Sequence, residues 1–507
     1  MESNNANNSD NFRPVYHFSP RKNWMNDPNG LVYYEGEYHL FFQHTPFSTL
    51  PSYDKMHWGH AVSKDLLNWE ELPIALAPDL YGAIFSGSAV IDQNNTSGFF
   101  GERNSGLVAI YTNSDNTMRF GKRQVQSIAY SKDNGRTWTK YEENPVISHE
   151  TSIDFRDPKV FWHTQSSKWI MLLAVGDKVE IYTSSNLKAW CYASSFSFEL
   201  ELQLGIVECP DLFELAVDND PCHTKWVLSI SLGNTRGTAI NELDPNAKGA
   251  RMLYFVGEFD GTTFVPDMPI TSVSDLTWVD YGPDFYAAAS WNYTPGQAGR
   301  TIWIGWMINT KYAELTPTDS EGWRGEMSIP RELSLTAVNG AIKLTQRPVR
   351  ELENYRKPVF TLKDRSIDSA RYDFQYLQLQ SFEIVAAFTK NMDAEFGFQI
   401  RSGSGKETII GYLPESGEIF IDRSRSGQRD FHPDFASRYV SKLNAFQDMI
   451  KVQILVDKSS IEVFVNDGIT VMSSLIFPEA DAKGFGIYSR CNDIKFHYLD
   501  IYNLASH

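Results

Sequence analysis

Three short motifs of the sequence each place a carboxylate where it could take part in catalysis. They are Asp27 in WMNDPNG, Asp157 in FRDP and Glu208 in ECPDLF. Each motif alone also fits a structural role, because Asn, Asp, Pro and Gly favour turns and an exposed ion pair contributes little. Together, the three motifs indicate a site built from acids.

The neighbours of two of these acids indicate opposite protonation states. Arg156 precedes Asp157, and an adjacent guanidinium can hold a carboxylate ionised and oriented. Glu208 follows the apolar residues 204–207, and an apolar setting can raise the pKa of a Glu enough to keep a proton available. Glycoside hydrolysis requires one ionised and one protonated carboxylate, and a third can stabilise an oxocarbenium-like transition state. The motifs therefore favour a glycosidase.

The three acids lie at the edges of predicted strands, so the arrangement of strands decides whether they meet. Helical periodicity is scarce, and most segments are short, aromatic or β-branched and end at turn residues, as is typical of strands. A weak repeat, in SKDLLNW, SKDNGRTW and SSNLKAW, ends at Trp69, Trp138 and Trp190. Units of about 60–70 residues predict the blades of a β-propeller, which gathers strand edges around a central channel. An irregular β-sandwich with coincidental turns is the alternative.

The sequence changes character near residues 345–360, where QRPVRELENYRKPVF is charged and interrupted by Pro. Beyond it, KVQILVD and SIEVFV alternate as antiparallel strands do, and Asn466-Asp467-Gly468 predicts a hairpin turn. The expected fold is all-β, with an antiparallel β-sandwich at its C-terminal end. The expected parts are a disordered tail (1–12), a five-bladed β-propeller catalytic domain (13–345), a linker (346–359) and the β-sandwich (360–507).

Charge and hydropathy exclude several classes of partner. The 507 residues include 46 Lys and Arg against 63 Asp and Glu, which gives a formal net charge of −17. No basic stripe offsets this charge, so we expect no nucleic-acid partner. No apolar run reaches the length of a membrane-spanning helix, so we expect no membrane partner. A neutral small molecule is the class of substrate that fits best.

Neither a metal nor an organic cofactor is expected. The pair His57 and His60 lacks the HExxH arrangement and a plausible helix, which favours structural histidines. The cysteines lack the paired spacing of a zinc site, and we expect mostly free thiols, with the thiol beside Glu208 buried and inert. They are Cys191, Cys209, Cys222 and Cys491.

The N-terminal segment MESNNANNSDNF contains no apolar core of a secretory signal. As written, the chain is expected to be cytoplasmic. A secreted protein whose leader has been removed is the alternative.

The motifs WMNDPNG, FRDP and ECPD, in this order and spacing, resemble the signature motifs of glycoside hydrolase family 32. This family contains invertases, exo-inulinases, levanases and fructan-processing enzymes. The resemblance extends from about residue 13 to residue 500 and includes MHWGH, FSGSAV, DYGPDFYAA, WRGEMSIPREL and IEVFVNDG. NNTSGFF and YFVGEFDG are similar to fungal members in particular. The resemblance implies a five-bladed propeller followed by a β-sandwich.

The resemblance also implies a role for each acid. Asp27 would be the nucleophile that forms a covalent fructosyl intermediate, and Glu208 would be the general acid and then the general base. Asp157, oriented by Arg156, would bind fructose hydroxyls and stabilise the transition state. The family positions that line the fructose pocket match Trp24, Asn26, Gln43, Phe85 and Ser86.

The activity implied is that of an invertase-like β-fructofuranosidase. Such a retaining hydrolase releases terminal β-D-fructofuranosyl residues from sucrose and short fructo-oligosaccharides by double displacement. The alternatives are an exo-inulinase or levanase acting on polymeric fructan, a fructosyltransferase that makes fructo-oligosaccharides, and, of a different class, a non-catalytic fructan-binding protein. Homo-oligomerisation through the sandwich stays open.

Three departures from the family pattern concern the rim of the pocket. Gln43-His44-Thr45-Pro46 stands where the family usually has QYNP, and the segment that follows lacks a Trp that commonly contacts substrate. Tyr53 is a candidate replacement for that Trp. Thr310 stands where a second sugar-contacting Trp is common. These changes predict a rim unlike that of a typical invertase and do not alter the reaction class.

Overall fold

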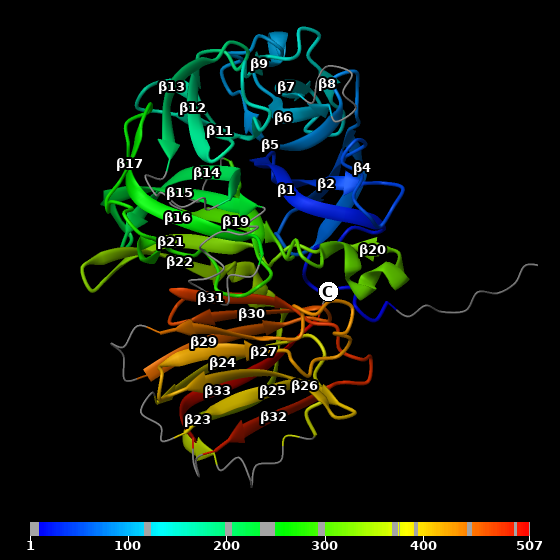
Figure 1. The fold of residues 1–507 in the computed structure, drawn as a ribbon, viewed down its shortest axis with the longest axis vertical. Helices are drawn as coiled ribbons and strands as arrows, with labels where there is room; N and C mark the ends of the chain where they lie inside the picture. Colours follow the sequence, from blue (N-terminus) through cyan, green and yellow to red (C-terminus); the bar gives the residue numbers. More distant parts are fainter. Residues whose placement is uncertain are drawn as a thin grey trace, which may run out of the picture.

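The structure is a computed structural model, and it shows an all-β chain in two stacked parts (Figure 1). It describes residues 10–115, 123–197, 205–233, 249–292, 300–367, 374, 376–389, 394–443, 449–490 and 494–505. Strands of the first part, coloured blue to green, lie above those of the second part, coloured yellow to red. The prediction of an all-β fold is confirmed.

The described residues of the first part form four sheets. The first sheet has the order β20 (Trp323–Arg324), β1 (Asn23–Tyr34), β2 (Glu37–Thr45), β3 (His57–Ser63), β4 (Trp69–Leu76). The second has β5 (Ala83–Ile91), β6 (Leu107–Asp115), β7 (Arg123–Ser131), β8 (Thr139–Lys140), with β9 (Ile147–Ser148) also on β7. The third has β10 (Arg156–His163), β11 (Lys168–Val175), β12 (Lys178–Ser184), β13 (Cys191–Ser197). The fourth has β17 (Phe264–Pro266), β16 (Arg251–Phe259), β15 (Asp220–Gly233), β14 (Ile206–Val217), β21 (Arg331–Val338), β19 (Thr301–Trp306), β18 (Tyr286–Ser290), with β22 (Ala341–Pro348) on β21.

Five strands of these four sheets lie at the centre of the first part. Among the described residues, β1 contacts β5, β5 contacts β10, β10 contacts β14, β14 contacts β18, and β18 contacts β1. These five strands therefore close a ring. We call them the ring strands.

The sequence repeat corresponds to one local structure used three times. The indole Nε1 atoms of Trp69, Trp138 and Trp190 donate to the carbonyl oxygens three residues earlier, at 3.0, 3.0 and 3.1 Å. A Ser and an Asp or Asn hydrogen-bond to each other at the start of each turn, as in Ser63 with Asp65. The predicted repeat is thus confirmed for these three units.

The second part is a sandwich of two antiparallel sheets that share one hydrophobic core. One sheet has β23 (Arg356–Ile367), β33 (Ile494–Leu504), β24 (Phe382–Thr389), β29 (Met449–Val456), β30 (Ser460–Val465), β31 (Thr470–Leu475). The other has β28 (Arg438–Lys442), β27 (Glu418–Asp422), β26 (Lys406–Leu413), β25 (Phe396–Gly403), β32 (Gly484–Ser489). The predicted hairpin at Asn466-Asp467-Gly468 joins β30 to β31.

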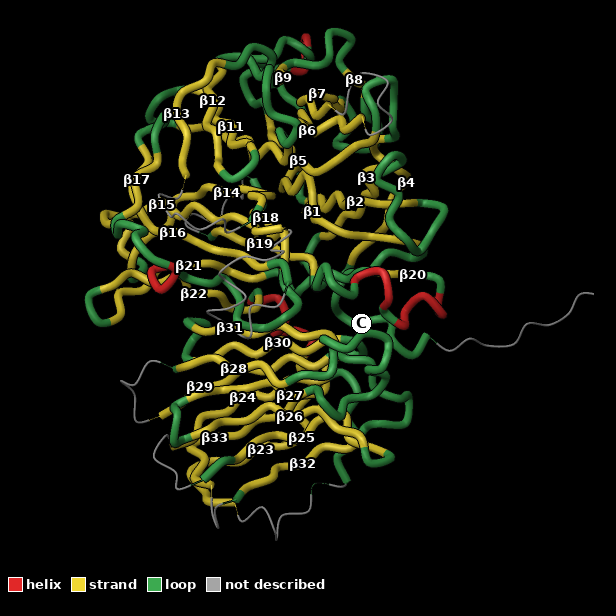
Figure 2. The backbone as a smooth tube through the Cα atoms, viewed as in Figure 1, coloured by secondary structure: helices red, strands yellow, loops and turns green. Residues whose placement is uncertain are grey.

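Helical structure in the described residues is limited to short 3-10 turns, the red segments of Figure 2. They are η1 (Gly101–Arg103), η2 (Val273–Asp275), η3 (Ala313–Leu315), η4 (Pro317–Glu321) and η5 (Arg350–Tyr355). Within the described residues, no helix is long and apolar enough to cross a membrane.

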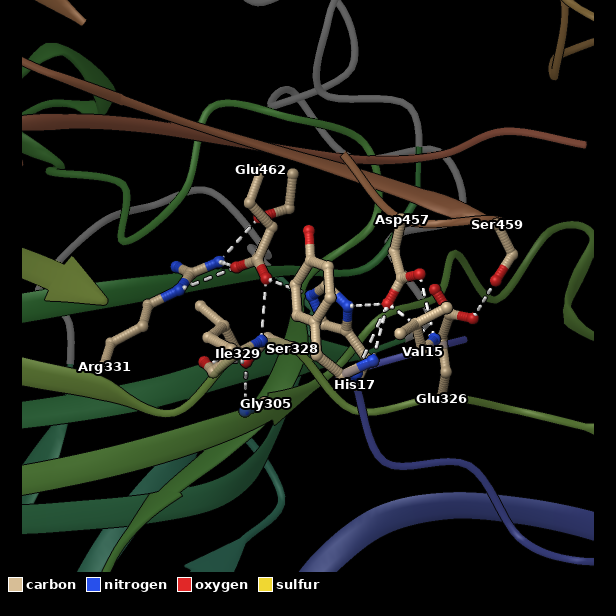
Figure 3. Close-up of polar contacts among 12 residues, drawn as sticks. Val15, His17, Gly305, Glu326, Ser328, Ile329, Arg331, Asp457, Ser459 and Glu462 are labelled. Atoms are coloured by element: carbon tan, nitrogen blue, oxygen red, sulfur yellow. Dashed lines mark hydrogen bonds and ion pairs between the residues drawn. The ribbon is translucent and has the colours of Figure 1, made fainter. Parts of the chain in front are cut away.

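The N-terminal segment lies between the two parts and binds the sandwich (Figure 3). His17 Nδ1 is 2.9 Å from an oxygen of Asp457, and its Nε2 is 2.9 Å from an oxygen of Glu462. The backbone N–H groups of Val15 and Tyr16 also donate to Asp457. Burial alone would lower the pKa of His17, but the two carboxylates raise it to about 10. His17 is therefore an imidazolium that joins both parts at neutral pH.

Arg331 extends this polar interface from the first part. Its side chain is fully buried and donates to Glu462 at 2.5 Å, to Asp280 at 3.2 Å, and to Ser473 at 2.6 Å. Glu462 thus has a cation on each side, from His17 and from Arg331 (Figure 3). A buried carboxylate needs such partners, because its desolvation is costly.

A second buried contact joins the sandwich to a loop of the first part. Arg423 of the sandwich donates to the hydroxyl of Tyr312 at 2.6 Å and to Asp284 at 2.5 Å. The hydroxyl of Tyr312 in turn donates to Asp284. Tyr312 directly precedes η3, so the sandwich holds the segment that leads into this turn.

Candidate active site

The ring strands bring their first residues to a single pocket. Its lining contains every residue that the sequence analysis assigns to catalysis or substrate binding: Trp24, Asn26, Asp27, Gln43, Phe85, Ser86, Arg156, Asp157 and Glu208. The cavity has a volume of about 200 Å³. The pocket is also lined by five residues that the sequence did not indicate as site residues: Met56, Tyr286, Trp306, Ala313 and Glu314.

Each ring strand carries an irregularity in its pairing close to its start. The register shifts between Met25 and Pro28, Ile84 and Gly87, Arg156 and Lys159, Glu208 and Asp211, and Tyr286 and Ala289. A β-bulge bends a strand and re-aims its side chains. Within three of these bulges, Asp157, Cys209 and Ala287 have positive φ angles of 61°, 45° and 53°. The repeated bulge is the local feature that brings residues of five strands to the pocket.

Asp27 is held by hydrogen bonds on both carboxylate oxygens. Ser86 donates to Oδ2 at 2.7 Å and Asn26 donates to Oδ1 at 3.1 Å. Trp24 Nε1 donates to the amide oxygen of Asn26 at 2.7 Å, which fixes the orientation of that amide. Burial raises the pKa of Asp27, while the hydrogen bond from Ser86 lowers it and the charge of Glu208 raises it. The contacts leave the carboxylate oriented in a desolvated pocket, as a nucleophile requires.

Asp157 is held mainly by the backbone of the third motif. The N–H of Cys209 donates to Oδ2 of Asp157 at 3.0 Å. Burial raises the pKa of Asp157 to about 7, because Arg156 only partly offsets the desolvation and the charges of Glu208 and Asp27 add to it. The expectation that Arg156 holds Asp157 ionised is therefore corrected, since the net effect of its surroundings favours the protonated form. The hydrogen bond from Cys209 directly joins the two motifs that carry Asp157 and Glu208.

Arg156 contacts the acids of two motifs and not Asp157 alone. Its guanidinium is 3.7 Å from Asp157, 3.0 Å from Glu208, and 2.5 Å from Asp154. The prediction that Arg156 serves to orient Asp157 is therefore incomplete, since its closer contacts are with the other two acids. Asp154 is 40% exposed and lies on the solvent side of this group.

Glu208 has a more polar setting than the sequence indicated. Its carboxylate accepts hydrogen bonds from Arg156 at 3.0 Å and from the hydroxyl of Tyr286. The apolar residues before it include Leu204, which lies outside the described residues. Burial raises the pKa of Tyr286 well above its ordinary value, so this hydroxyl stays protonated and donates. Arg156 and Tyr286 fix the two oxygens of Glu208 separately.

Two buried donors in the pocket have no hydrogen-bond partner among the described residues. They are Nε2 of Gln43 and Nε1 of Trp306. Buried donors are nearly always paired in folded proteins, so an unpaired one that lines a cavity indicates a ligand oxygen as its partner. Trp306 packs edge-on against Trp24 with ring centroids 5.9 Å apart. A substrate with several hydroxyl groups would satisfy both donors.

The rim positions that depart from the family pattern also belong to this pocket. Tyr53 and Thr310 line it, and Tyr53 is 56% exposed. Lys311, next to Thr310, pairs with Asp434 of the sandwich at 3.1 Å. The rim is thus built partly from the loop that Arg423 holds through Tyr312.

The other candidate residues have structural roles. His60 stacks on Phe41 and lies 3.0 Å from His39, and His57 bonds to the carbonyl of Lys55. No group of three or more His, Cys, Asp or Glu in the described residues could hold a metal ion.

The described cysteines are free thiols, as expected, whereas Cys491 lies outside the described residues. Cys209 is half-buried, with its Sγ 3.5 Å from Asp27 and 3.6 Å from Asp157. Burial and the neighbouring carboxylates raise the pKa of its thiol well above the ordinary value. The prediction of an unreactive Cys209 is consistent with this setting, because the thiolate is the reactive form.

Gly233 on β15 has no side chain, and the carboxylate of Glu208 occupies the space that a side chain would take. A Cβ at this position would lie 2.3 Å from Oε2 of Glu208 and 3.1 Å from the hydroxyl of Tyr286. We expect Gly233→Ala to displace the carboxylate and to lower kcat about 100-fold, since displacements near 1 Å have costs of this size. Steady-state kinetics on sucrose would measure the loss. Gly486→Ala in β32, where the added methyl first meets the side-chain oxygen of Gln399 at 3.0 Å, is the control and should leave kcat unchanged. Equal kinetics for both variants would contradict the steric role of Gly233.

The raised pKa of Asp157 predicts a pH-dependent stability difference. The pKa rises from 3.8 to about 7 on folding, so the folded state binds the proton more tightly than the unfolded state. Stability from this group is therefore present at low pH and is lost as pH rises from about 4 to about 7. Asp157→Asn cannot titrate, so its free energy of unfolding relative to the unmodified protein should increase over this range, by at most about 4 kcal/mol, and stay level above it. Urea unfolding at pH 4, 5.5, 7 and 8.5 would test this. A difference that is constant with pH would show that Asp157 keeps its ordinary pKa.

Models of known protein families match both parts of the chain. The model of the glycosyl hydrolases family 32 N-terminal domain matches residues 17–348, and that of the family 32 C-terminal domain matches residues 351–503. A levanase of Bacillus subtilis (strain 168) is 47% identical over 497 residues, which cover 97% of this chain and 70% of that relative.

Two solved structures share the complete fold. The exo-inulinase of Aspergillus awamori has a TM-score of 0.85 and 38% identity, with 98% of each chain covered. A variant of the fructofuranosidase of Schwanniomyces occidentalis, complexed with fructosylnystose, has a TM-score of 0.85 and 32% identity, with 100% of each chain covered. The relatives thus include both bacterial and fungal proteins. The similarity of NNTSGFF and YFVGEFDG to fungal members therefore does not identify the chain as fungal. The chain belongs to glycosyl hydrolase family 32.

Proposed function

We propose that the protein is a retaining hydrolase that releases terminal β-D-fructofuranosyl residues from sucrose and short fructo-oligosaccharides. The observation that carries the proposal is the meeting of Asp27, Asp157 and Glu208 in one small pocket with unpaired donors. The volume of the pocket, about 200 Å³, supports a small sugar unit as the group that it binds. The similarity to a levanase, an exo-inulinase and a fructofuranosidase supports fructose as the sugar bound.

In the first step, Asp27 attacks the anomeric carbon of the fructosyl unit and forms an ester bond to it. Glu208 donates its proton to the glycosidic oxygen, so the bond to the leaving sugar breaks with a neutral hydroxyl on that sugar. Hydrogen bonds from Ser86 and Asn26 hold Asp27 for attack from one side. Glu208 receives its orientation from Tyr286 and Arg156.

In the second step, Glu208 takes a proton from water, and the water oxygen displaces Asp27 from the anomeric carbon. Two inversions at one centre give net retention of configuration. Asp157 bonds to fructose hydroxyls, and in its ionised form its negative charge stabilises the positive charge that develops on the ring. Gln43 Nε2 and Trp306 Nε1 supply donors to further hydroxyls. These reacting groups carry out both steps with side chains of this protein alone.

The second candidate is hydrolysis of polymeric fructan from its end. The relative at 47% identity is named a levanase, and a structural relative at 38% identity is named an exo-inulinase. The rim with Tyr53, Thr310 and Glu314 in the lining supports a preference for substrates other than sucrose. Both candidates use the same reaction and differ in what the rim binds.

We further propose that the ring strands are the innermost strands of a five-bladed propeller. The eight-stranded sheet would then supply two blades, one from β14–β17 and one from β18, β19, β21 and β22. Closure of the ring by contact of β18 with β1 supports this count. The predicted linker, 346–359, would contain the end of β22, η5 and the start of β23.

Product analysis tests the proposed function. The purified protein is incubated separately with sucrose, 1-kestose, inulin and levan, and free glucose, free fructose and longer oligomers are quantified. Equal glucose and fructose from sucrose, with little from the polymers, would support the first candidate. Fructose mainly from inulin or levan would support the second, and excess glucose with growing oligomers would indicate transfer. No product from any of the four would overturn the enzymatic assignment.

A further inference from the structure

A second cavity lies at the ends of two ring strands, β5 and β10, opposite to the ends that form the active-site pocket. Its lining includes Val90 and Ile91 at the end of β5, and Phe161 and Trp162 near the end of β10. Its volume is about 410 Å³, against about 200 Å³ for the pocket with the three acids. Ile91 lies five positions after Ser86 along β5, which is about 16 Å at the usual rise per residue. The cavity is therefore separate from the active site.

Trp162 gives this cavity an exposed aromatic face. The residue is 37% exposed, and the ring of Trp169 packs edge-on against it with centroids 5.1 Å apart. Trp169 is itself fixed, because its Nε1 donates to the hydroxyl of Thr96 at 2.9 Å. The fixed ring of Trp169 thus supports the ring of Trp162. A ring supported in this way loses little conformational entropy when a ligand packs on it. Flat aromatic faces of this kind suit the C–H faces of sugars.

The polar lining is rich in amides and hydroxyls and carries no available charge. Asp92 is the only ionisable residue in the described part of the lining, and it is fully buried. Both of its carboxylate oxygens accept hydrogen bonds from the backbone and hydroxyl groups of Thr96 and Ser97. The exposed side chains around the opening are Gln93, Asn94 and Thr164. Among the described residues no Lys or Arg lines the cavity, so its lining does not favour phosphate or other anions.

The end of the cavity nearest the ring is a rigid wall. Asn292 donates through its side-chain amide to the carbonyl of Ala89 at 2.8 Å and to that of Val160 at 2.9 Å. Its backbone N–H donates to the carbonyl of Leu31 at 3.0 Å. Three ring strands are thus fixed at their far ends by one residue. A cavity with such a wall is preformed, as binding sites for small molecules usually are.

We propose that this cavity is a second saccharide-binding site, which holds an inner segment of a fructan chain. An immobilised indole next to amide and hydroxyl groups, without net charge, is complementary to a neutral sugar. The identity of the sugar as fructan rests on the proposed function. A polymer held here stays near the protein between cleavage events, so its chain ends reach the active site at a higher effective concentration. Sucrose has no inner segment and gains nothing from the site.

The test compares Trp162→Ala with Tyr192→Ala. Tyr192 is a matched control because it is an exposed aromatic, at 57%, on the same sheet as Trp162, and it packs edge-on against Tyr182. It lies outside the cavity lining. Trp162→Phe retains an aromatic face and serves as the rescue variant. Thermal unfolding of all three variants checks that each one is folded.

The first readout is KM for levan and inulin against KM for sucrose. Trp162→Ala should raise KM for a polymer about fivefold or more, the size expected for loss of an aromatic anchor, and leave the sucrose value within about twofold. Trp162→Phe should recover most of the affinity, and Tyr192→Ala should behave as the unmodified protein. Equal changes for polymer and sucrose, or the same polymer KM in all variants, would overturn the second site.

The second readout separates this proposal from the proposed function. Native gel electrophoresis in gels with dissolved levan or inulin measures binding without turnover, with each change placed in the Asp27→Asn background. Retardation that Trp162→Ala weakens and Tyr192→Ala does not would support the site even if no hydrolysis is found. Retardation unaffected by Trp162→Ala, or none at all, would overturn the site while the product analysis still decides the function.

Discussion

Asp27→Asn should lower kcat for sucrose by about four to six powers of ten, the range reported for loss of an essential catalytic side chain. The amide keeps the shape of the carboxylate but cannot form the ester intermediate. Neither Asp157 nor Glu208 can take its place without leaving its own contacts. Asp157 accepts from the N–H of Cys209, and Glu208 is held by Arg156 and Tyr286. The residual rate should therefore be close to background.

Initial-rate assays with sucrose, with glucose as the measured product, would determine the loss. Asp154→Asn is the matched control, because Asp154 contacts Arg156 but is absent from the pocket lining. Its kcat should fall less than about tenfold, the size of a weakened partly exposed ion pair. If Asp27→Asn retained turnover near that of the control, Asp27 would not be the nucleophile.

Arg331→Met should lower the free energy of unfolding by about 3–5 kcal/mol, the usual cost of removing one partner of a buried ion pair. The Met side chain fills much of the same space, but Asp280 and Glu462 stay buried with fewer donors. Glu462 would keep only the contact with His17 as an ion pair. Because these residues connect the two parts, the loss should appear in the unfolding of both.

Urea unfolding followed by tryptophan fluorescence would measure this change. Arg347→Met is the control, since Arg347 also crosses the interface, to Asp467 at 3.3 Å, but the two side chains are 60% and 48% exposed. Such a pair contributes at most about 1 kcal/mol. Equal unfolding midpoints for Arg331→Met and Arg347→Met would mean that burial of the Arg331 network adds no stability.

The three acids could be predicted from sequence because each lies in a short motif with its own turn chemistry. The Trp repeat was also readable, since the bond from each indole to the carbonyl three residues earlier is entirely local. The same holds for the hairpin at Asn466-Asp467-Gly468. Local interactions of this kind leave a pattern in the sequence. The order and spacing of the motifs then carry the family resemblance.

The residues that the sequence did not reveal depend on pairing between distant strands. Tyr286 meets Glu208 across 78 positions, and Gly233 matters only because β15 pairs with β14 beside Glu208. No local pattern shows that a glycine is there for another strand's side chain. The setting of Glu208 was misjudged for the same reason, since its polar partners come from β10 and β18 and not from the apolar residues before it.

The contact of His17 with the sandwich sets an order of events during synthesis. His17 leaves the ribosome before Asp457 and Glu462, which lie 440 and 445 positions later. At about 5–20 residues per second, these partners emerge roughly 20–90 seconds afterwards. Until then the imidazole lacks the two carboxylates that raise its pKa, and the backbone of the first segment lacks the acceptor that holds it. The segment around His17 can therefore dock only after Asp457 and Glu462 have emerged, although it is made well before them.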